Sequence, residues 1–113
     1  MDTIDGATFD ELRETAGVEF VTELVDTFFA EAPQMLADLR RARDTADADR
    51  FRRAAHSLKS NGATFGAQEL ASMAKALELG GLAADPARDI EAIAALDAAY
   101  ARAASALKEM CRG

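Results

Sequence analysis

The chain has 113 residues, half of them apolar, with a formal net charge of −7. This length suits a single domain over residues 1–113, with a core over about residues 18–110. The acidic charge argues against a nucleic-acid partner. The single cysteine, Cys111, rules out an internal disulfide. No apolar run approaches the roughly 20 residues needed to span a bilayer. With no leader-like segment at the N-terminus either, we expect a soluble, cytoplasmic protein without a membrane partner.

The composition predicts helices, because Ala, Leu, Glu and Arg dominate and β-branched residues are scarce. The first helix should begin at the capping-box pattern Thr8-Phe9-Asp10-Glu11 and end at Gly17. A second helical segment follows over about residues 18–45. Pro33 lies inside it, and a proline there removes one backbone hydrogen bond and clashes with the preceding turn. We therefore expect a kink or a break near Ala32.

Three further helices are predicted from their end signals. Asp47 caps a helix over about residues 48–64, and the next, over about 67–79, ends at Gly80-Gly81. Asp85-Pro86 begins the last helix, which runs to about residue 110. Because the connections are short, successive helices should be antiparallel. The predicted fold is all-α, an antiparallel up-and-down four-helix bundle preceded by a short extra helix.

Apolar residues recur at helical spacing in the two longest segments. In residues 18–45 they are Phe20, Leu24, Phe28, Met35, Leu36 and Leu39. In the last helix they are Ile90, Ile93, Leu96, Tyr100 and Leu107. We expect both sets to face the core.

A helical wheel of residues 48–64 places the only histidine, His56, on the solvent side. The core stripe consists of Phe51, Ala55, Leu58, Gly62 and Phe65. At about 100° per residue, His56 lies about 140° from this stripe, while Ser60 is near 180° and Lys59 near 80°. A buried structural histidine is therefore disfavoured, and an idle surface histidine remains the alternative to a functional one.

The surroundings of His56 are small and locally basic. Ser60, Asn61 and Ala63 form a low-relief surface that leaves the imidazole uncovered. Residues 40–59 contain seven bases against three acids, and the bases are Arg40, Arg41, Arg43, Arg50, Arg52, Arg53 and Lys59. This patch is either a solvated charged face or a docking surface for an acidic partner or a phosphoryl group.

Two residues are placed to assist the imidazole. The turn before the fourth helix centres near Ala67, so Glu78 should lie beside His56 in an antiparallel pair. A carboxylate that accepts from Nδ1–H leaves Nε2 free as a nucleophile, although Glu78 is otherwise an ordinary exposed glutamate. Lys59, one turn from His56, can stabilise the oxygens of a transferred phosphoryl group.

The segment from Ala54 to Ala67 resembles the signature of histidine-containing phosphotransfer (Hpt) domains. Their pattern is His-x-Leu-Lys-Gly, small residues, and then an apolar residue followed by Gly-Ala. Here Ser60 replaces the glycine, and Glu78 stands where relatives often carry Gln or Glu. The similarity covers about residues 15–110.

The resemblance implies a phosphorelay intermediate that has no ATP-dependent kinase activity. His56 would accept a phosphoryl group from the phospho-aspartate of a response-regulator receiver domain and pass it to another receiver, with a hybrid histidine kinase as a further candidate partner. Mg²⁺ would belong to the receiver, so this chain needs no cofactor or metal of its own. We expect a monomer whose docking face contains Arg52, Arg53, Ser60, Asn61 and Ala63.

Two other classes of function are alternatives to this one. A helical adaptor that binds receiver or kinase domains without phosphotransfer would be indicated by loss of the histidine or the lysine, but both are present. An enzyme or di-iron protein is disfavoured, because the chain has one histidine and no Glu-x-x-His pair.

Overall fold

Five α-helices make up the computed structural model, which describes residues 3–112, and no strand occurs in that range. They are α1 (Gly6–Ala16), α2 (Val18–Asp44), α3 (Ala48–Thr64), α4 (Gln68–Gly80) and α5 (Pro86–Arg112). The predicted all-α class is confirmed. Asp47 caps α3 as expected, because its Oδ1 accepts a hydrogen bond from the Arg50 backbone N–H at 3.0 Å.

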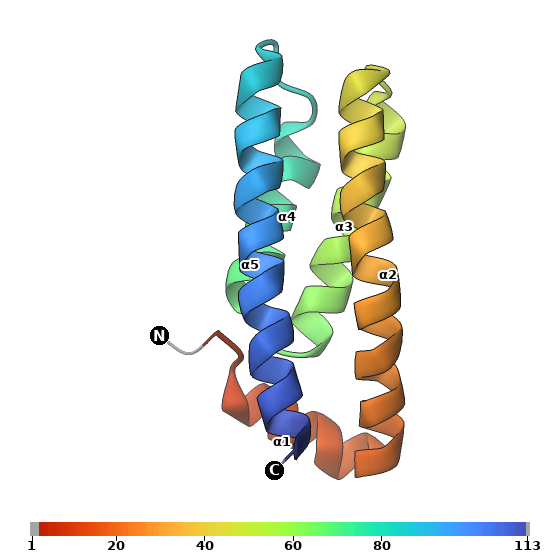
Figure 1. Cartoon of the computed structure of the whole chain (residues 1–113), viewed down its shortest axis with the longest axis vertical. Coiled ribbons are helices and arrows are strands. Elements are labelled where there is room, and N and C mark those ends of the chain that lie inside the picture. The colour runs from red at the N-terminus through yellow and green to blue at the C-terminus, as the bar shows by residue number, and fades with distance from the viewer. Residues whose placement is uncertain (1–2, 113) are drawn as a thin grey trace.

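The four longer helices lie side by side along the long axis of the molecule (Figure 1). The chain reverses its direction at each connection, so that α2 and α4 run one way and α3 and α5 the other. Helix α3 packs against α2 and α4, and α5 also packs against α2 and α4, which closes the arrangement into a ring. Helix α1 lies across one end, beside the start of α2 (Figure 1).

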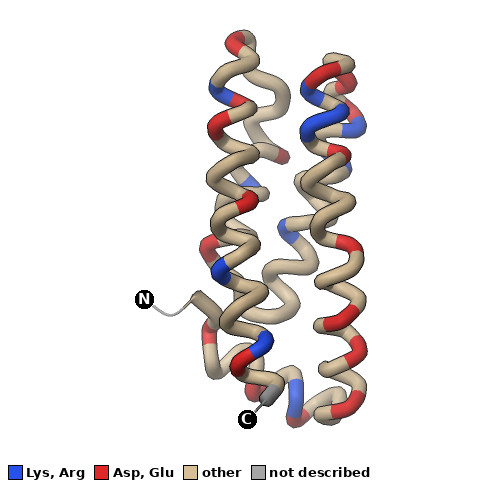
Figure 2. Tube along the Cα trace, in the orientation of Figure 1, with Lys and Arg blue, Asp and Glu red and all other residues tan. Residues whose placement is uncertain are grey.

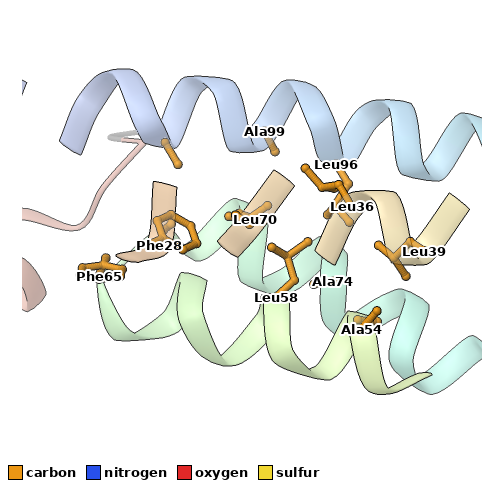
Figure 3. Close-up of a cluster of buried hydrophobic side chains, with 14 of the residues drawn as sticks. Phe28, Leu36, Leu39, Ala54, Leu58, Phe65, Leu70, Ala74, Leu96 and Ala99 are labelled. Carbon is orange, nitrogen blue, oxygen red and sulfur yellow. The ribbon is translucent and has the colours of Figure 1, made fainter. Parts of the chain in front are cut away.

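Side chains from α2, α3, α4 and α5 meet in one apolar core (Figure 3). Phe28 of α2, Phe65 after α3 and Leu96 of α5 are each at most 2% exposed. The core stripe predicted for α3 is buried along its whole length. This burial fixes the rotation of α3 and therefore decides which of its residues face solvent.

Helix α2 contains Pro33, where a kink or a break was expected near Ala32. A break does not occur, because α2 continues as one helix of 27 residues through Pro33. The adjacent Ala32 is fully buried, so tertiary packing holds the helix where a backbone hydrogen bond is missing.

Two residues expected in the core are exposed. Phe20 is 51% exposed and Ile90 is 60% exposed. Each lies in the first turns of a long helix, α2 or α5. Helical spacing alone does not reveal where a neighbouring helix stops covering an apolar face.

Helix α1 begins three residues earlier than the capping-box pattern predicted, because Asp5 rather than Thr8 is in the N-cap position. Instead of capping, Thr8 Oγ1 donates to Asp5 Oδ2 at 2.5 Å. The Asp5 backbone N–H donates to the Gly66 carbonyl at 2.8 Å. Gly66 has a φ of +80°, and a Cβ there would lie 3.0 Å from the Asp5 carbonyl oxygen. The start of α1 is thus held against the α3–α4 turn.

A buried ion pair joins the end of α2 to the start of α5. Arg43 Nη1 donates to Asp89 Oδ2 at 2.7 Å, and Asp89 is 2% exposed. The same carboxylate oxygen accepts from the Ala83 N–H at 2.9 Å, and Arg43 also donates to the Ala83 carbonyl at 3.0 Å. This closed network fixes the α4–α5 connection to the bundle.

Charge is distributed unevenly along the bundle (Figure 2). Acidic residues follow the N-terminal half of α2, and arginines gather near its C-terminal end (Figure 2). Among residues 3–112, no helix combines the length and the apolar character that a bilayer crossing requires.

Candidate functional site

The site lies on the hairpin of α3 and α4, which pack along each other. His56 Nδ1 is 2.5 Å from Glu78 Oε2. The His56 side chain is 55% exposed, whereas that of Glu78 is only 14% exposed. The hairpin therefore brings a largely covered carboxylate against an accessible imidazole.

Lys59 completes the cluster from one turn along α3. Its Nζ donates to Glu78 Oε1 at 2.7 Å. Each carboxylate oxygen of Glu78 therefore contacts one residue of α3. The hydrogen bond from Lys59 lowers the pKa of the Glu78 carboxyl below its ordinary value, and the bond from His56 acts in the same direction. Partial desolvation of Glu78 opposes this shift. Glu78 is therefore an anion at neutral pH.

An anionic Glu78 determines which nitrogen of His56 carries the proton. A carboxylate only accepts hydrogen bonds, so Nδ1 must be the protonated nitrogen of a neutral ring. The lone pair then lies on Nε2. An exposed imidazole that is oriented through its other nitrogen is the usual arrangement of a histidine nucleophile.

Two of the three small residues expected around the ring are at the surface. Ser60 and Ala63 are both exposed, and neither carries a side chain long enough to cover the imidazole. Arg52 and Arg53 are also exposed, but both pair with Asp49, at 2.9 Å and 3.1 Å. Asp49 thus offsets part of the basic charge expected here.

Asn61 does not lie where the predicted docking face requires it. Its Nδ2 donates to the Ser57 carbonyl at 2.8 Å and lies 3.9 Å from Met35 Sδ of α2. Asn61 therefore faces α2, on the side of α3 away from Glu78. Five positions at about 100° each put Asn61 about 140° around α3 from His56, so nearness in sequence did not mean a common surface.

Sequence reasoning missed two neighbours of the site. Asp49 precedes Arg52 and Arg53 by three and four residues, the spacing at which helical side chains pair. Leu79, next to Glu78, is 75% exposed. Leu79 falls outside the apolar stripe of α4, and this position in the sequence could have predicted its exposure.

The residues that the structure describes contain no group of three or more His, Cys, Asp or Glu side chains placed to hold a metal ion. Cys111 is exposed near the end of α5.

A model of the Hpt domain family matches residues 23–111, well over half of the chain. The chain belongs to the Hpt domain family. The matched range includes His56, Lys59 and Glu78, and the family predicted from the sequence is confirmed. Hpt domains are helical phosphocarriers rather than kinases, so membership places the chain in phosphorelay signalling. No curated protein and no solved structure gives a significant match.

Proposed function

We propose that this Hpt protein is a phosphorelay intermediate that carries the phosphoryl group on Nε2 of His56. The carrier would be the antiparallel four-helix bundle of α2 to α5, acting as a monomer in the cytoplasm. The observation that supports this role most strongly is the 2.5 Å contact between Nδ1 of the exposed ring and the Glu78 carboxylate. It directs the lone pair of Nε2 outward, where a partner can reach it.

The proposed transfer needs no proton movement within this chain. The Nε2 lone pair attacks the phosphorus of a receiver's phospho-aspartate, the Nε2–P bond forms, and the P–O bond to the aspartate breaks. The bonding electrons leave with the aspartate carboxylate, and the proton on Nδ1 stays hydrogen-bonded to Glu78. The group passes on when a second receiver's aspartate attacks it in turn.

Lys59 is the proposed electrostatic partner of the phosphoryl group. Its ammonium is one helical turn from the imidazole and 29% exposed, so it can turn from Glu78 toward phosphoryl oxygens. Charge-assisted hydrogen bonds of this kind are stronger than neutral ones and help most where charge develops. Mg²⁺ would be supplied by the receiver, and the carrier itself would use no cofactor.

The proposed docking face surrounds His56 on the exposed side of α3. Ser60 and Ala63 allow close approach, and Arg52 and Arg53 give the face a basic edge that suits the acidic pocket of a receiver. Asn61 faces α2 and is left out of this surface. A receiver, or a hybrid kinase that carries one, is the proposed partner.

Label transfer tests the proposal. The protein is mixed with a receiver domain that carries a radiolabelled phospho-aspartate, and acid-labile, alkali-stable label is followed on the wild type and on His56→Gln. Glu69→Gln is the control, because Glu69 pairs with Arg102 of α5 on another side of α4. We expect label on the wild type and the control only. An unlabelled wild type, or equal label on His56→Gln, would refute the proposal.

A further inference from the structure

Glu78 contacts the imidazole nitrogen that does not receive the phosphoryl group. If the proposed function holds, this contact remains in place when Nε2 is phosphorylated, because the phosphoryl group is added on the exposed side of the ring. The further inference rests on that function and concerns the second half of the cycle, in which the group leaves.

The protonation state of the phosphorylated ring decides how well it serves as a leaving group. A ring that keeps its proton on Nδ1 departs as neutral imidazole. A ring that has lost this proton must depart as imidazolate, a far stronger base and a poorer leaving group. Donation is therefore fast only while Nδ1 remains protonated.

We propose that Glu78 is a positioning residue that keeps phosphorylated His56 protonated on Nδ1, so that the phosphoryl group can be donated well above neutral pH. When a receiver's aspartate oxygen attacks phosphorus, the O–P bond forms and the P–Nε2 bond breaks. The electron pair returns to Nε2, and neutral imidazole remains hydrogen-bonded to Glu78. Transfer is then proton-neutral in both directions.

The contacts of Glu78 favour this role. A carboxylate at hydrogen-bond distance stabilises the positively charged, Nδ1-protonated ring. The side chain of Glu78 is 14% exposed, so water screens this attraction less than it would at an open surface. The Lys59 hydrogen bond lowers the pKa of the Glu78 carboxyl, so the carboxylate is charged at and above neutral pH.

The other charged groups near the ring act less directly. Lys59 opposes protonation of the ring, but its ammonium is paired with Oε1 of Glu78. Arg52, one turn earlier in α3, is engaged by Asp49. Lys75, one turn before Glu78 in α4, is exposed to solvent. Helix α2 packs on the other side of α3, as the contact between Asn61 and Met35 shows. Glu78 is therefore the charge in direct contact with Nδ1.

An NMR titration tests the inference without any receiver. The chain has one histidine, so a ¹⁵N-histidine label reports a single ring. The protein is phosphorylated chemically with phosphoramidate, and the protonation of Nδ1 is followed against pH in the wild type and in Glu78→Gln. Glutamine keeps the shape and an accepting oxygen but removes the charge. We expect Glu78→Gln to lose the proton about one pH unit lower than the wild type.

Two further variants make this result specific. Glu69→Gln removes a carboxylate from the part of α4 that faces α5 and should titrate like the wild type. Glu78→Asp keeps the charge on a shorter side chain and should retain the proton to a higher pH than Glu78→Gln. Equal titration of the wild type and Glu78→Gln would overturn the inference.

The rate of donation to a receiver gives a second readout. The quantity compared is the donation rate of phosphorylated Glu78→Gln divided by that of the wild type. Above the pH at which the variant ring loses its proton, this ratio should be about tenfold lower than at pH 6. A rate ratio that does not change with pH would mean that Glu78 only orients the ring, and would also overturn the inference. A wild type that accepts no phosphoryl group from any receiver would instead refute the proposed function, and the chemical titration would still test Glu78.

Discussion

His56 and Glu78 are 22 residues apart in the chain, yet Nδ1 of one lies 2.5 Å from Oε2 of the other. The short turn between α3 and α4 makes this contact possible, because it holds the two helices in a fixed register. The packed core of both helices then leaves little freedom to shift that register. A surface histidine is thus oriented by a rigid scaffold rather than by a loop.

Replacing Lys59 should impair transfer without unfolding the bundle. We expect Lys59→Ala to slow phosphoryl transfer about tenfold, because one partly exposed charge partner of the phosphoryl oxygens is lost. The melting temperature should change little, since the side chain is 29% exposed. Rapid-mix transfer assays and thermal melts measure both effects. Lys108→Ala is the control, because Lys108 of α5 lies over the Phe29 ring of α2. Equal rates for wild type and Lys59→Ala would remove the role given to Lys59.

Glu78 should titrate at lower pH than an ordinary glutamate. Lys59 lowers the pKa of Glu78 below 4.5, so the ionised side chain stabilises the fold above pH 4.5. This contribution is lost as the pH falls through the lowered pKa. Carbon NMR of the Glu78 carboxyl should show a midpoint below 4.5, and Lys59→Ala should raise it. A midpoint at or above 4.5 in the wild type contradicts the geometry of the cluster.

The ion pair between Arg43 and Asp89 should matter far more for stability than the pair between Arg40 and Asp97. Both join α2 to α5, but Asp89 is 2% exposed, whereas the Asp97 side chain is 37% exposed. Asp89→Ala leaves Arg43 without its partner and should cost about 3–5 kcal/mol. Asp97→Ala should cost less than about 1 kcal/mol. Urea unfolding at pH 7 measures both, and equal losses would show that the Asp89 network does not secure α5.

Two glycines in the hairpin should respond in opposite ways to alanine. Gly66→Ala should cost about 2 kcal/mol or more, because φ is +80° and the new Cβ would lie 3.0 Å from the Asp5 carbonyl oxygen. At Gly62 the new Cβ would meet its nearest atom, the Ala71 backbone nitrogen, at 3.4 Å. Gly62→Ala should therefore be neutral or stabilise the helix by up to about 1 kcal/mol. Urea unfolding compares the two variants, and similar losses would contradict this reading of the turn.

Local patterns predicted much of the fold. The start of α3 follows from Asp47 and the end of α4 from Gly80 and Gly81. The burial of Leu58 and its stripe follows from spacing alone. The same stripe predicted that His56 is exposed. The contact between His56 and Glu78 could be predicted, because residues equally far before and after a short turn lie side by side in antiparallel helices.

The features that sequence reasoning missed depend on distant or competing partners. α1 begins at Gly6 because Asp5 bonds to Gly66 across the molecule, which a local capping pattern cannot show. Phe20 is exposed because the burial of an apolar residue depends on where its neighbours end. Asp89 is buried because Arg43 lies opposite it, and that proximity exists only once the bundle has formed.

In the proposed mechanism, His56 accepts the phosphoryl group on Nε2 while Glu78 accepts a hydrogen bond from Nδ1–H. The most direct measurement is a long-range ¹H–¹⁵N spectrum of the single labelled histidine before and after phosphorylation by a receiver. We predict a ring protonated on Nδ1 beforehand, and afterwards a phosphorus coupling at Nε2 with Nδ1 still protonated. The proposed mechanism is wrong if the ring is protonated on Nε2 beforehand, if the phosphoryl group is on Nδ1, or if it is on any residue other than His56.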